Sequence, residues 1–484
     1  MHFIVKFFPE ITIKSPPVRK RFVKHLRDNL RQLYKSLSFP VKVDRDWDKI
    51  DVYSELDTPE AVAQVAEVLA HTPGIAYFAQ VQTFPLGDLD DIFEKTKMIW
   101  GEALAGKTFC VRVKRNGEHE FSSIEVERYV GGGLNQHTEA AGVKLKNPDI
   151  TVRMEIKKDL LHVIETQTQG LGGFPLGTQE PVLSLVSGGF DSTVSSYLMI
   201  KRGIRTHYCF FNLGGRAHEV GVKEVAYYLW NKFGASHRVM FVTVPFEDVV
   251  TEILEKVDNS QMGVVLKRMM LRAATQVAEQ MEIPALVTGE AVAQVSSQTL
   301  TNLTVIDSVT DTLTLRPLIV MDKGDIIDIA RKIGTEELSA VIPEYCGVIS
   351  RKPTTRAQEE RVAHEESKFD MSVLQTAIDT RRMVPIDDVV NDLEDEVKVD
   401  VQSRVDVDQV IIDVRHPDEE ELRPLRIEGA TVLKIPFFRL SADFPALEKS
   451  KQYLLYCEKG IMSQLHAANL KDAGHDNLGV YRPE

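Results

Sequence analysis

The chain has 484 residues and a formal net charge of −13, and 43% of its residues are hydrophobic. This length exceeds what one hydrophobic core supports, and the composition is that of a globular protein, so we expect two to four domains. No apolar run approaches the length of a membrane span, and the N-terminus lacks the charged and then apolar pattern of an export leader, so we expect a cytoplasmic protein.

The four cysteines exclude several kinds of site. None of them forms a Cys-x-x-Cys pair, which argues against a zinc knuckle, a locally spaced iron–sulfur centre and a disulfide scaffold. Cys110 and Cys209 lie inside apolar strand-like runs and are expected in the core. Cys346 lies in a turn-like segment next to a glycine, and its surroundings in sequence leave its role undecided. We predict no metal ligands of the protein's own.

The negative charge is unevenly distributed along the chain. Residues 1–175 carry 24 Lys/Arg and 24 Asp/Glu, residues 176–385 carry 22 and 26, and residues 386–484 carry 12 and 21. The acidity therefore belongs to the C-terminal part. The total charge does not exclude RNA binding by this protein.

Residues 1–60 combine a predicted strand, His2–Phe8, with a basic segment. Between Lys14 and Lys42 there are nine Lys/Arg and one acidic residue, Asp28. Apolar residues recur every three or four positions there and predict an amphipathic helix: Phe22, Leu26, Leu30, Leu33 and Leu37. Five basic residues lie largely off this apolar stripe: Arg19, Lys20, Lys24, Arg27 and Arg31. They form either a solvated helix face or a surface for phosphate groups.

Residues 61–169 have the pattern of a small α/β domain. The predicted elements are a helix, a strand, a second helix with a glycine turn, and a strand: Ala61–Leu69, Phe109–Val113, Gly131–Gly133 for the turn, and Ile150–Ile156. The glycines fit either a turn or a helix C-cap, and Lys144–Pro148 is expected to end a helix. This order resembles the THUMP RNA-binding domain, preceded by the ferredoxin-like domain that often accompanies it.

A glycine- and proline-rich connector, Gly170–Gly177, predicts a domain boundary. Strands and helices then alternate, which predicts a mostly parallel, Rossmann-like sheet with its ligand at the carboxyl ends of the strands. The predicted elements are Val182–Val186, Thr206–Phe211, Val220–Phe233, Val239–Val244, Val264–Met281 and Ala285–Thr288. Three strand ends carry glycine-containing segments that we expect to converge on one nucleotide pocket: Ser187–Ser192, Phe211–Gly215 and Gly289–Ala291.

The first of these segments reads Ser187-Gly188-Gly189-Phe190-Asp191-Ser192. A strand, a tight glycine turn and a helix aim backbone N–H groups at an anion, and the serine hydroxyls add donors. No Gly-Lys-Ser/Thr closes the turn, so it is not a P-loop. The alternative is a plain glycine turn between a core strand and a surface helix.

This SGGxDS segment resembles the pyrophosphatase-type loop of the PP-loop family, whose members transfer AMP from ATP and release pyrophosphate. The stretch Thr288–Thr299 resembles the second signature of PP-loop RNA-modifying enzymes. The resemblance implies nucleotide contacts from Leu185, Val186, Ser187, Gly188, Gly189, Ser192, Lys267, Gly289 and Gln298. It also implies that Asp191, with Mg²⁺, and Lys323 assist adenylyl transfer. Without it, Leu185 and Val186 simply pack a strand, and the two lysines are exposed helix residues.

The C-terminal part begins with an acidic segment, residues 386–403, which we interpret as a linker. In residues 404–484, Val410–Arg415 and Gln452–Ser463 predict a last α/β unit, and Cys457 follows an apolar strand at a helix start. A thiol there is expected to have a lowered pKa and to hold a thiolate or persulfide. The alternative is a buried core thiol.

Asp-Val-Arg followed by strand-Cys-x-x-Gly-x-x-Ser resembles the rhodanese domain, whose cysteine carries sulfur as a persulfide. The loop lacks the arginine that suits thiosulfate, so a protein sulfur donor is expected. Taken together, the chain resembles the tRNA 4-thiouridine synthetase family, and the segment PEYCGVIS around Cys346 adds to the match.

This resemblance implies a multidomain α/β protein with a ferredoxin-like domain (1–60), a THUMP domain (61–169), a PP-loop domain (176–385), the linker and a rhodanese domain (404–484). It implies ATP-dependent thiolation of uridine 8 of tRNA, with a Cys346–Cys457 redox disulfide and a cysteine desulfurase as sulfur donor. It also implies sulfur delivery to the carrier protein of thiamine thiazole synthesis. A PP-loop amidating ligase and a non-catalytic sulfur relay that binds RNA are the competing interpretations.

Overall fold

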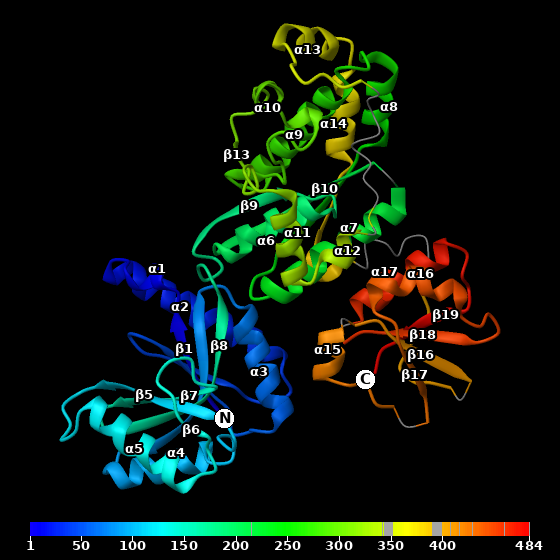
Figure 1. The fold of residues 1–484 in the computed structure, drawn as a ribbon. Helices are drawn as coiled ribbons and strands as arrows, with labels where there is room; N and C mark the ends of the chain where they lie inside the picture. The colour runs from blue at the N-terminus through cyan, green and yellow to red at the C-terminus, as the bar shows by residue number, and fades with distance from the viewer. Residues whose placement is uncertain are drawn as a thin grey trace. The chain divides into compact units, whose positions relative to one another are not determined.

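The structure is a computed structural model that describes residues 1–213, 215–340, 342, 352–389, 399–406, 408–415, 417–427, 429–458 and 460–483 (Figure 1). The chain divides into two compact units, Met1–Pro175 and Leu176–Glu484. Across these described ranges, no helix is both long enough and apolar enough to cross a membrane.

The first unit is built on one eight-stranded sheet in the order β2-β3-β1-β4-β8-β7-β5-β6. Its long central pair, β4 and β8, is antiparallel and runs through both halves of the sheet. The strands are β1 His2–Phe7, β2 Lys42–Arg45, β3 Ile50–Tyr53, β4 Ile75–Pro85, β5 Thr108–Asn116, β6 Gly142–Val143, β7 Ile150–Lys157 and β8 Leu160–Gly172.

Helices cover one face of this sheet and create two cores. The helices are α1 Pro9–Thr12, α2 Pro16–Leu33, α3 Pro59–His71, α4 Leu89–Trp100 and α5 Ser123–His137, with a 3₁₀ turn at Tyr34–Ser36. The first core joins α2 and α3 to β1, β3 and β4, and the second joins α4 and α5 to β5, β7 and β8. The predicted amphipathic helix is confirmed as α2, although Leu37 lies beyond its end.

Four expectations for this unit differ from the structure. The boundary at residue 60 cuts α3, whose Val65 and Leu69 are fully buried in the first core. The glycine triplet is not a turn but lies inside α5, where a Cβ on Gly133 would stand 2.6 Å from the Phe93 ring. Gly133 lets α5 approach α4 closely, and the two helices lie side by side in Figure 1.

The third correction concerns the segment before β7. No helix precedes it; β6 pairs in parallel with β5, and an irregular segment follows. The segment is tied down where the Thr108 N–H and hydroxyl donate to Asp149 Oδ2 at 2.8 and 2.6 Å. The predicted connector also begins inside β8, and its Phe174 is buried in the first core.

The second unit contains a six-stranded sheet in the order β13-β12-β9-β10-β11-β14, parallel except for the β11–β14 pair. The strands are β9 Gln179–Leu185, β10 Ile204–Asn212, β11 Met240–Pro245, β12 Ala285–Val287, β13 Leu313–Leu315 and β14 Arg382–Pro385. The helices are α6 Phe190–Lys201, α7 Gly215–Phe233, α8 Glu247–Lys256, α9 Met262–Gln280, α10 Leu300–Asp307, α11 Lys323–Ile333, α12 Glu336–Ala340, α13 Glu359–Glu366 and α14 Met371–Asp379, with 3₁₀ turns at Ser296–Gln298 and Ile386–Asp388.

The predicted alternation of strands and helices is confirmed, and the sheet order places the site. From β9 the chain moves outward to β10 and β11, and then crosses to the other side of β9 to form β12 and β13. The strand order therefore reverses between β9 and β12. In open parallel sheets such a reversal leaves a crevice at the carboxyl ends of the strands, where ligands bind.

A second, five-stranded sheet in the same unit is parallel throughout, in the order β15-β19-β18-β16-β17. Its strands are β15 Val401–Gln402, β16 Gln409–Asp413, β17 Thr431–Lys434, β18 Gln452–Tyr456 and β19 Leu478–Tyr481, and its helices are α15 Pro417–Leu422, α16 Phe437–Asp443 and α17 Ile461–Asp472, with a 3₁₀ turn at Phe444–Ala446. Both ends of the predicted linker, residues 386–403, belong to the folded unit. Ile386 and Val389 are fully buried at its start, and β15 pairs with β19 at its end. Residues 390–398 lie outside the described part.

Candidate active site

The glycine turn that the sequence predicts as an anion-binding turn, Ser187–Ser192, forms between β9 and α6. Gly189 is the N-cap of α6, so the first helical N–H groups open onto this turn. Ser187 is exposed, whereas the Ser192 hydroxyl accepts a hydrogen bond from the Ser187 N–H at 3.1 Å and lies 3.2 Å from the Gly189 carbonyl oxygen. Ser192 therefore braces the turn in this conformation, and Ser187 faces the open side.

Two glycines are required by their surroundings. Gly188 has φ +78°, and a Cβ there would lie 2.4 Å from Ile342 Cδ1. Gly289, at the end of β12, sits against the first turn of α6: a Cβ would lie 2.6 Å from the Asp191 carbonyl carbon and the Ser192 nitrogen. Any side chain at residue 289 would push the anion-binding turn away from the neighbouring strand.

Asp191 connects the turn with two other segments. Its Oδ1 accepts a hydrogen bond from Lys323 Nζ at 2.7 Å, and its Oδ2 accepts one from Gln294 Nε2 at 2.8 Å. Lys323 is the first residue of α11, and its ammonium also lies 5.6 Å from the Phe190 ring. The structure thus brings together two predicted catalytic residues 132 positions apart in sequence.

A cavity of about 570 Å³ opens beside this turn. The predicted nucleotide-binding residues line it, with the exception of Gly188: Leu185, Val186, Ser187, Gly189, Asp191, Ser192, Lys267, Gly289 and Gln298. Gln298 is 8% exposed, and its Oε1 has no hydrogen-bond partner among the residues that the structure describes. A buried acceptor without a partner is costly, so its position on the cavity wall points to a ligand donor.

Three residues at this cavity were given no role of their own in the sequence analysis. Gln294 holds Asp191, Glu290 binds Lys267, and His218 places Nε2 at 3.4 Å from the Ser187 carbonyl oxygen. Gln294 and Glu290 belong to the stretch Thr288–Thr299, so that stretch carried a usable signal. His218, in α7, lies far from both signatures in sequence. Burial lowers the pKa of His218, which is therefore neutral at pH 7.

The second predicted site lies at the start of α17. Cys457 follows β18 directly, is 7% exposed, and its Sγ accepts a hydrogen bond from the Ser463 N–H at 3.3 Å. The Ser463 hydroxyl lies 3.4 Å from the same sulfur. Burial raises the pKa of the thiol, although hydrogen bonds from Ser463, Gly460 and Met462 oppose this. The expected lowering of the pKa is therefore wrong.

A buried ion pair supports the sulfur site from β16. Arg415 Nε donates to Asp413 Oδ1 at 2.9 Å, and its second terminal nitrogen donates to Oδ2 at 2.6 Å. Both side chains are at most 3% exposed, and the guanidinium lies 5.2 Å from the Tyr456 ring. This bidentate pair uses the Asp-Val-Arg motif to hold the end of β16 beside the residue that precedes Cys457.

Cys346 lies outside the described residues. Ile342, four positions earlier in the sequence, is described. Ile342 contacts the Gly188 position and also packs on the apolar cluster that contains Cys457, together with Val225 and Tyr228 of α7. Within the second unit, the side chain of Ile342 therefore borders both the glycine turn and the apolar cluster around Cys457.

The two cysteines that the sequence predicts in the core, Cys110 and Cys209, are confirmed as buried free thiols.

The first unit offers a different kind of surface. Because β1, β5 and β7 bury alternate residues under the helices, Lys6, Arg112 and Arg153 point to the opposite, open face. A cavity of about 360 Å³ there is lined by these three residues and by Lys114. Arg112, Lys114 and Arg153 are exposed, so the surface offers positive charge over a continuous sheet.

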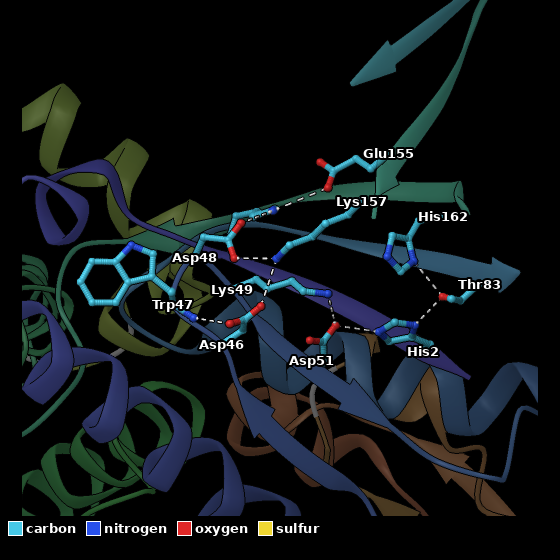
Figure 2. A network of polar contacts seen from close by, with 11 residues as sticks. His2, Asp46, Trp47, Asp48, Lys49, Asp51, Thr83, Glu155, Lys157 and His162 are labelled. Atoms are coloured by element: carbon cyan, nitrogen blue, oxygen red, sulfur yellow. Dashed lines mark hydrogen bonds and ion pairs between the residues drawn. The ribbon is translucent and has the colours of Figure 1, made fainter. Parts of the chain in front are cut away.

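A polar network joins the two halves of this open face, as Figure 2 shows. Thr83 Oγ1 lies 3.0 Å from His2 Nδ1 and 2.9 Å from His162 Nδ1, and His2 Nε2 lies 2.9 Å from Asp51 Oδ1. Burial lowers the pKa of His162 to about 4, so its ring is neutral at pH 7. Lys157 adds a bridge to Asp46 at 3.0 Å.

Comparisons with known proteins agree with this arrangement. The family model described as thiamine biosynthesis protein (ThiI) matches residues 177–371, the ThiI ferredoxin-like domain 2–79, the THUMP domain 87–164 and the rhodanese-like domain 397–482. The tRNA sulfurtransferase of Saccharophagus degradans is 58% identical over 483 residues, and that of Shewanella woodyi is 57% identical over 484 residues. Both matches cover 100% of each chain.

Two solved structures are similar in fold. A 4-thiouridine synthetase, crystallised in complex with RNA and with bound ATP, superposes with a TM-score of 0.70 and 25% identity, covering 79% of this chain and 99% of that one. PH1313 from Pyrococcus horikoshii gives a TM-score of 0.55 at 18% identity, covering 69% of this chain and 100% of that one, which shows the fold alone. The fold, the two sites and the full-length relatives agree: the chain belongs to the tRNA sulfurtransferase family.

Proposed function

We propose that this chain transfers sulfur to a uridine of tRNA, uridine 8, to form 4-thiouridine, and that ATP activates the oxygen that sulfur replaces. The names of the full-length relatives and of the similar RNA-bound synthetase support the overall reaction. The observation that carries the proposal is that one compact unit contains both the Asp191–Lys323 pair at an anion-binding turn and Cys457 at a helix start.

The activation step follows from the chemistry of the base. Oxygen on C4 of uridine is a poor leaving group, so it attacks the α-phosphorus of ATP, pyrophosphate departs, and the N3 proton is lost. The product carries AMP on O4. The N–H groups at the start of α6 and the Lys323 ammonium would stabilise negative charge on the phosphates, and Gln298 and Lys267, which line the cavity, would contact the nucleotide.

Mg²⁺ fits this site through Asp191. No group of three or more His, Cys, Asp or Glu side chains suited to a metal ion occurs in the part of the chain that is described. Mg²⁺ at nucleotide sites, however, is held by one or two carboxylates together with phosphates and water, and Asp191 is a carboxylate on the turn itself. When bound, the ion would neutralise charge on the departing pyrophosphate.

The sulfur step uses a persulfide on Cys457. Its terminal sulfur attacks C4, AMP leaves, and the product is linked to Cys457 through a disulfide bond. The Cys346 thiolate then attacks Cys457 Sγ, which frees 4-thiouridine and leaves a Cys346–Cys457 disulfide that a thiol reductant resets. In a second route the Cys346 thiolate attacks Cys457 Sγ first, which forms the same disulfide and releases hydrosulfide, and the hydrosulfide then attacks C4 as AMP leaves. Ile342 packs on the apolar cluster that contains Cys457 and precedes Cys346 by four residues. Four residues of fully extended chain span at most about 14 Å, so this packing supports the proposed pairing of the two cysteines.

The open face of the first unit is the proposed tRNA surface. Its exposed arginines and lysine suit phosphate groups, and Figure 2 shows the polar contacts that hold its two halves together. A family match to the THUMP domain over residues 87–164 supports the same assignment. We expect tRNA binding to weaken as the salt concentration rises, because phosphate contacts release bound counterions.

Two protein partners complete the proposal. A cysteine desulfurase is the sulfur donor, since the loop after Cys457 has no arginine for thiosulfate. The same persulfide supplies the small sulfur carrier protein of thiamine thiazole synthesis, which needs a sulfur donor but no tRNA. Support for both is the rhodanese-like family match over residues 397–482.

Mass spectrometry of tRNA nucleosides tests the function. Incubation of the chain with unmodified tRNA, ATP and a persulfide source is expected to produce 4-thiouridine, and omission of ATP is expected to abolish it. An ATP–pyrophosphate exchange that depends on tRNA separates this enzyme from a sulfur relay. Formation of an amidated nucleoside, or no exchange at all, would contradict the proposal.

Cys346→Ser tests the resolving step. This variant is expected to exchange pyrophosphate and to accept persulfide normally, yet to complete few turnovers, because Cys457 cannot release the product. Peptide mapping of the wild-type chain after one turnover without reductant should show a Cys346–Cys457 link. A Cys346→Ser chain that thiolates tRNA at the wild-type rate over many turnovers would remove Cys346 from the mechanism.

A further inference from the structure

A row of side chains with alternating charge runs from the nucleotide cavity into the protein. Lys267 Nζ lies 2.5 Å from Glu290 Oε1, and Arg316 Nε lies 2.8 Å from Glu290 Oε2. Arg316 also binds both carboxylate oxygens of Asp307, at 2.9 and 2.5 Å. The Thr288 hydroxyl donates to Glu290 Oε2 at 3.1 Å, so the Glu290 carboxylate is held by three different segments.

Only one end of this row opens onto the cavity. Lys267 and Glu290 line it, whereas Arg316 and Asp307 do not. The side chain of Lys267 is 23% exposed, compared with 10% for Glu290. The ammonium of a lysine has three N–H donors, and Glu290 takes one of them. The Lys267 ammonium is therefore the member of the row that is placed to meet a ligand.

The charge state of Glu290 decides what it can do. Burial by itself would raise the pKa of Glu290, but Lys267 and Arg316 outweigh it and lower the pKa to about 2. A carboxylate with so low a pKa binds a proton too weakly to act as a general base near neutral pH. Glu290 is thus a fixed anion whose two oxygens are committed to cations.

We propose that Glu290 is a positioning residue that holds the Lys267 ammonium in the nucleotide cavity before ATP arrives. This inference rests on the proposed function, because it requires a nucleotide in that cavity. A free lysine side chain loses rotamer entropy when it is fixed. Glu290 fixes it in the unliganded protein, so binding ATP does not bear that cost. Arg316 is also paired with Asp307, so the row is neutral as a whole, and the Lys267 ammonium is the charge that it presents to the cavity.

A double-mutant cycle on the full chain tests this inference. The affinity for ATP is measured by calorimetry for the wild type, Glu290→Gln, Lys267→Met and the double variant. Glu290→Gln is expected to raise the Kd about tenfold, within the range for coupled side chains. In the Lys267→Met background the same change should have almost no further effect, because Glu290 acts through Lys267.

A matched control separates positioning from simple loss of stability. Glu366 is also a buried carboxylate paired with α9, where Arg268 binds it at 2.6 Å and Arg272 at 3.4 Å, but it does not line the cavity. Glu366→Gln should lower the melting temperature as Glu290→Gln does, and leave the Kd for ATP unchanged.

The outcomes distinguish this inference from the function beneath it. A wild-type chain that binds no ATP overturns the proposed function and the inference together. A wild-type chain that binds ATP, with Glu290→Gln at the wild-type Kd or with effects that add fully in the double variant, overturns the inference alone. If Glu290→Gln does not fold, Glu290→Asp keeps the charge but shortens the reach; an unchanged Kd in that variant also overturns it.

Discussion

The two reactive centres of the second unit are built alike and differ in access. In each, a parallel strand ends in a turn and a helix begins: β9 leads to α6, and β18 leads to α17. The first turn exposes Ser187 beside a cavity of about 570 Å³. In the second turn Cys457 is 7% exposed and Ser463 is fully buried.

This difference shows that a position at a helix start does not by itself determine the charge state of a side chain. A helix N-terminus stabilises an anion by about 0.3–1 kcal/mol, less than one pKa unit. Full burial of an ionisable group shifts its pKa by up to about 3–5 units in the opposite sense. Burial therefore dominates at Cys457 and keeps a protonated thiol, whereas the turn at Asp191 stays open beside a cavity.

The largest effect expected from this comparison is that of Cys457→Ser. Thiolation of tRNA should fall to background, because serine cannot carry a persulfide sulfur. ATP–pyrophosphate exchange in the presence of tRNA should continue, since Asp191 and Lys323 lie in α6 and α11, beside the six-stranded sheet rather than the sheet that carries Cys457. Loss of exchange in this variant would show that the two centres are not chemically separate.

Asp191→Ala is the reciprocal change and should reduce thiolation by about 10²–10³-fold, because Lys323 and Mg²⁺, which would stabilise charge on the phosphates, lose the carboxylate that holds them. Lys323 and Gln294 would lose their shared partner at the same time. Persulfide formation on Cys457, followed by mass spectrometry after incubation with a desulfurase, should be unaffected. A variant unable to accept sulfur would contradict the independence of the two centres.

Gly289→Ala tests how much room the turn between β9 and α6 needs, because the added methyl group would press against Asp191 and Ser192. Its new Cβ would lie 2.6 Å from the α6 backbone, so the turn must move, with an expected cost of about 1–3 kcal/mol in folding stability. The Kd for ATP should rise while Cys457 still accepts sulfur. Thermal unfolding and calorimetry measure the two effects, and wild-type values for both would mean that the turn tolerates the shift.

The smallest effect concerns the buried turn between β18 and α17, which begins with Cys457. Because burial raises the pKa of Cys457, its alkylation by iodoacetamide should be slow at pH 7, and its rate should rise about tenfold per pH unit up to pH 9 without levelling off. Ser463→Ala removes the hydroxyl 3.4 Å from the sulfur but keeps the N–H bond, so the pKa should rise further. A rate that levels off below pH 8 would contradict this account.

Much of the architecture followed from local patterns. The alternation of strands and helices between β9 and β12 was predicted from periodicity, and the two turns from glycine and hydroxyl residues after apolar runs. The errors occur where local signals are ambiguous. Gly131–Gly133 suggested a turn, because nothing near them in sequence shows that Phe93 of another helix requires small residues there.

The sequence by itself determined which groups the protein has: an anion-binding turn, a second signature, a cysteine at a helix start. Only the tertiary structure decided their partners, because those partners are distant along the chain. Gln294 and Lys323 share one carboxylate, Arg316 meets Glu290, and burial sets the charge state of Cys457. Spacing and composition describe neighbours in sequence, whereas ion pairing and desolvation depend on neighbours in space.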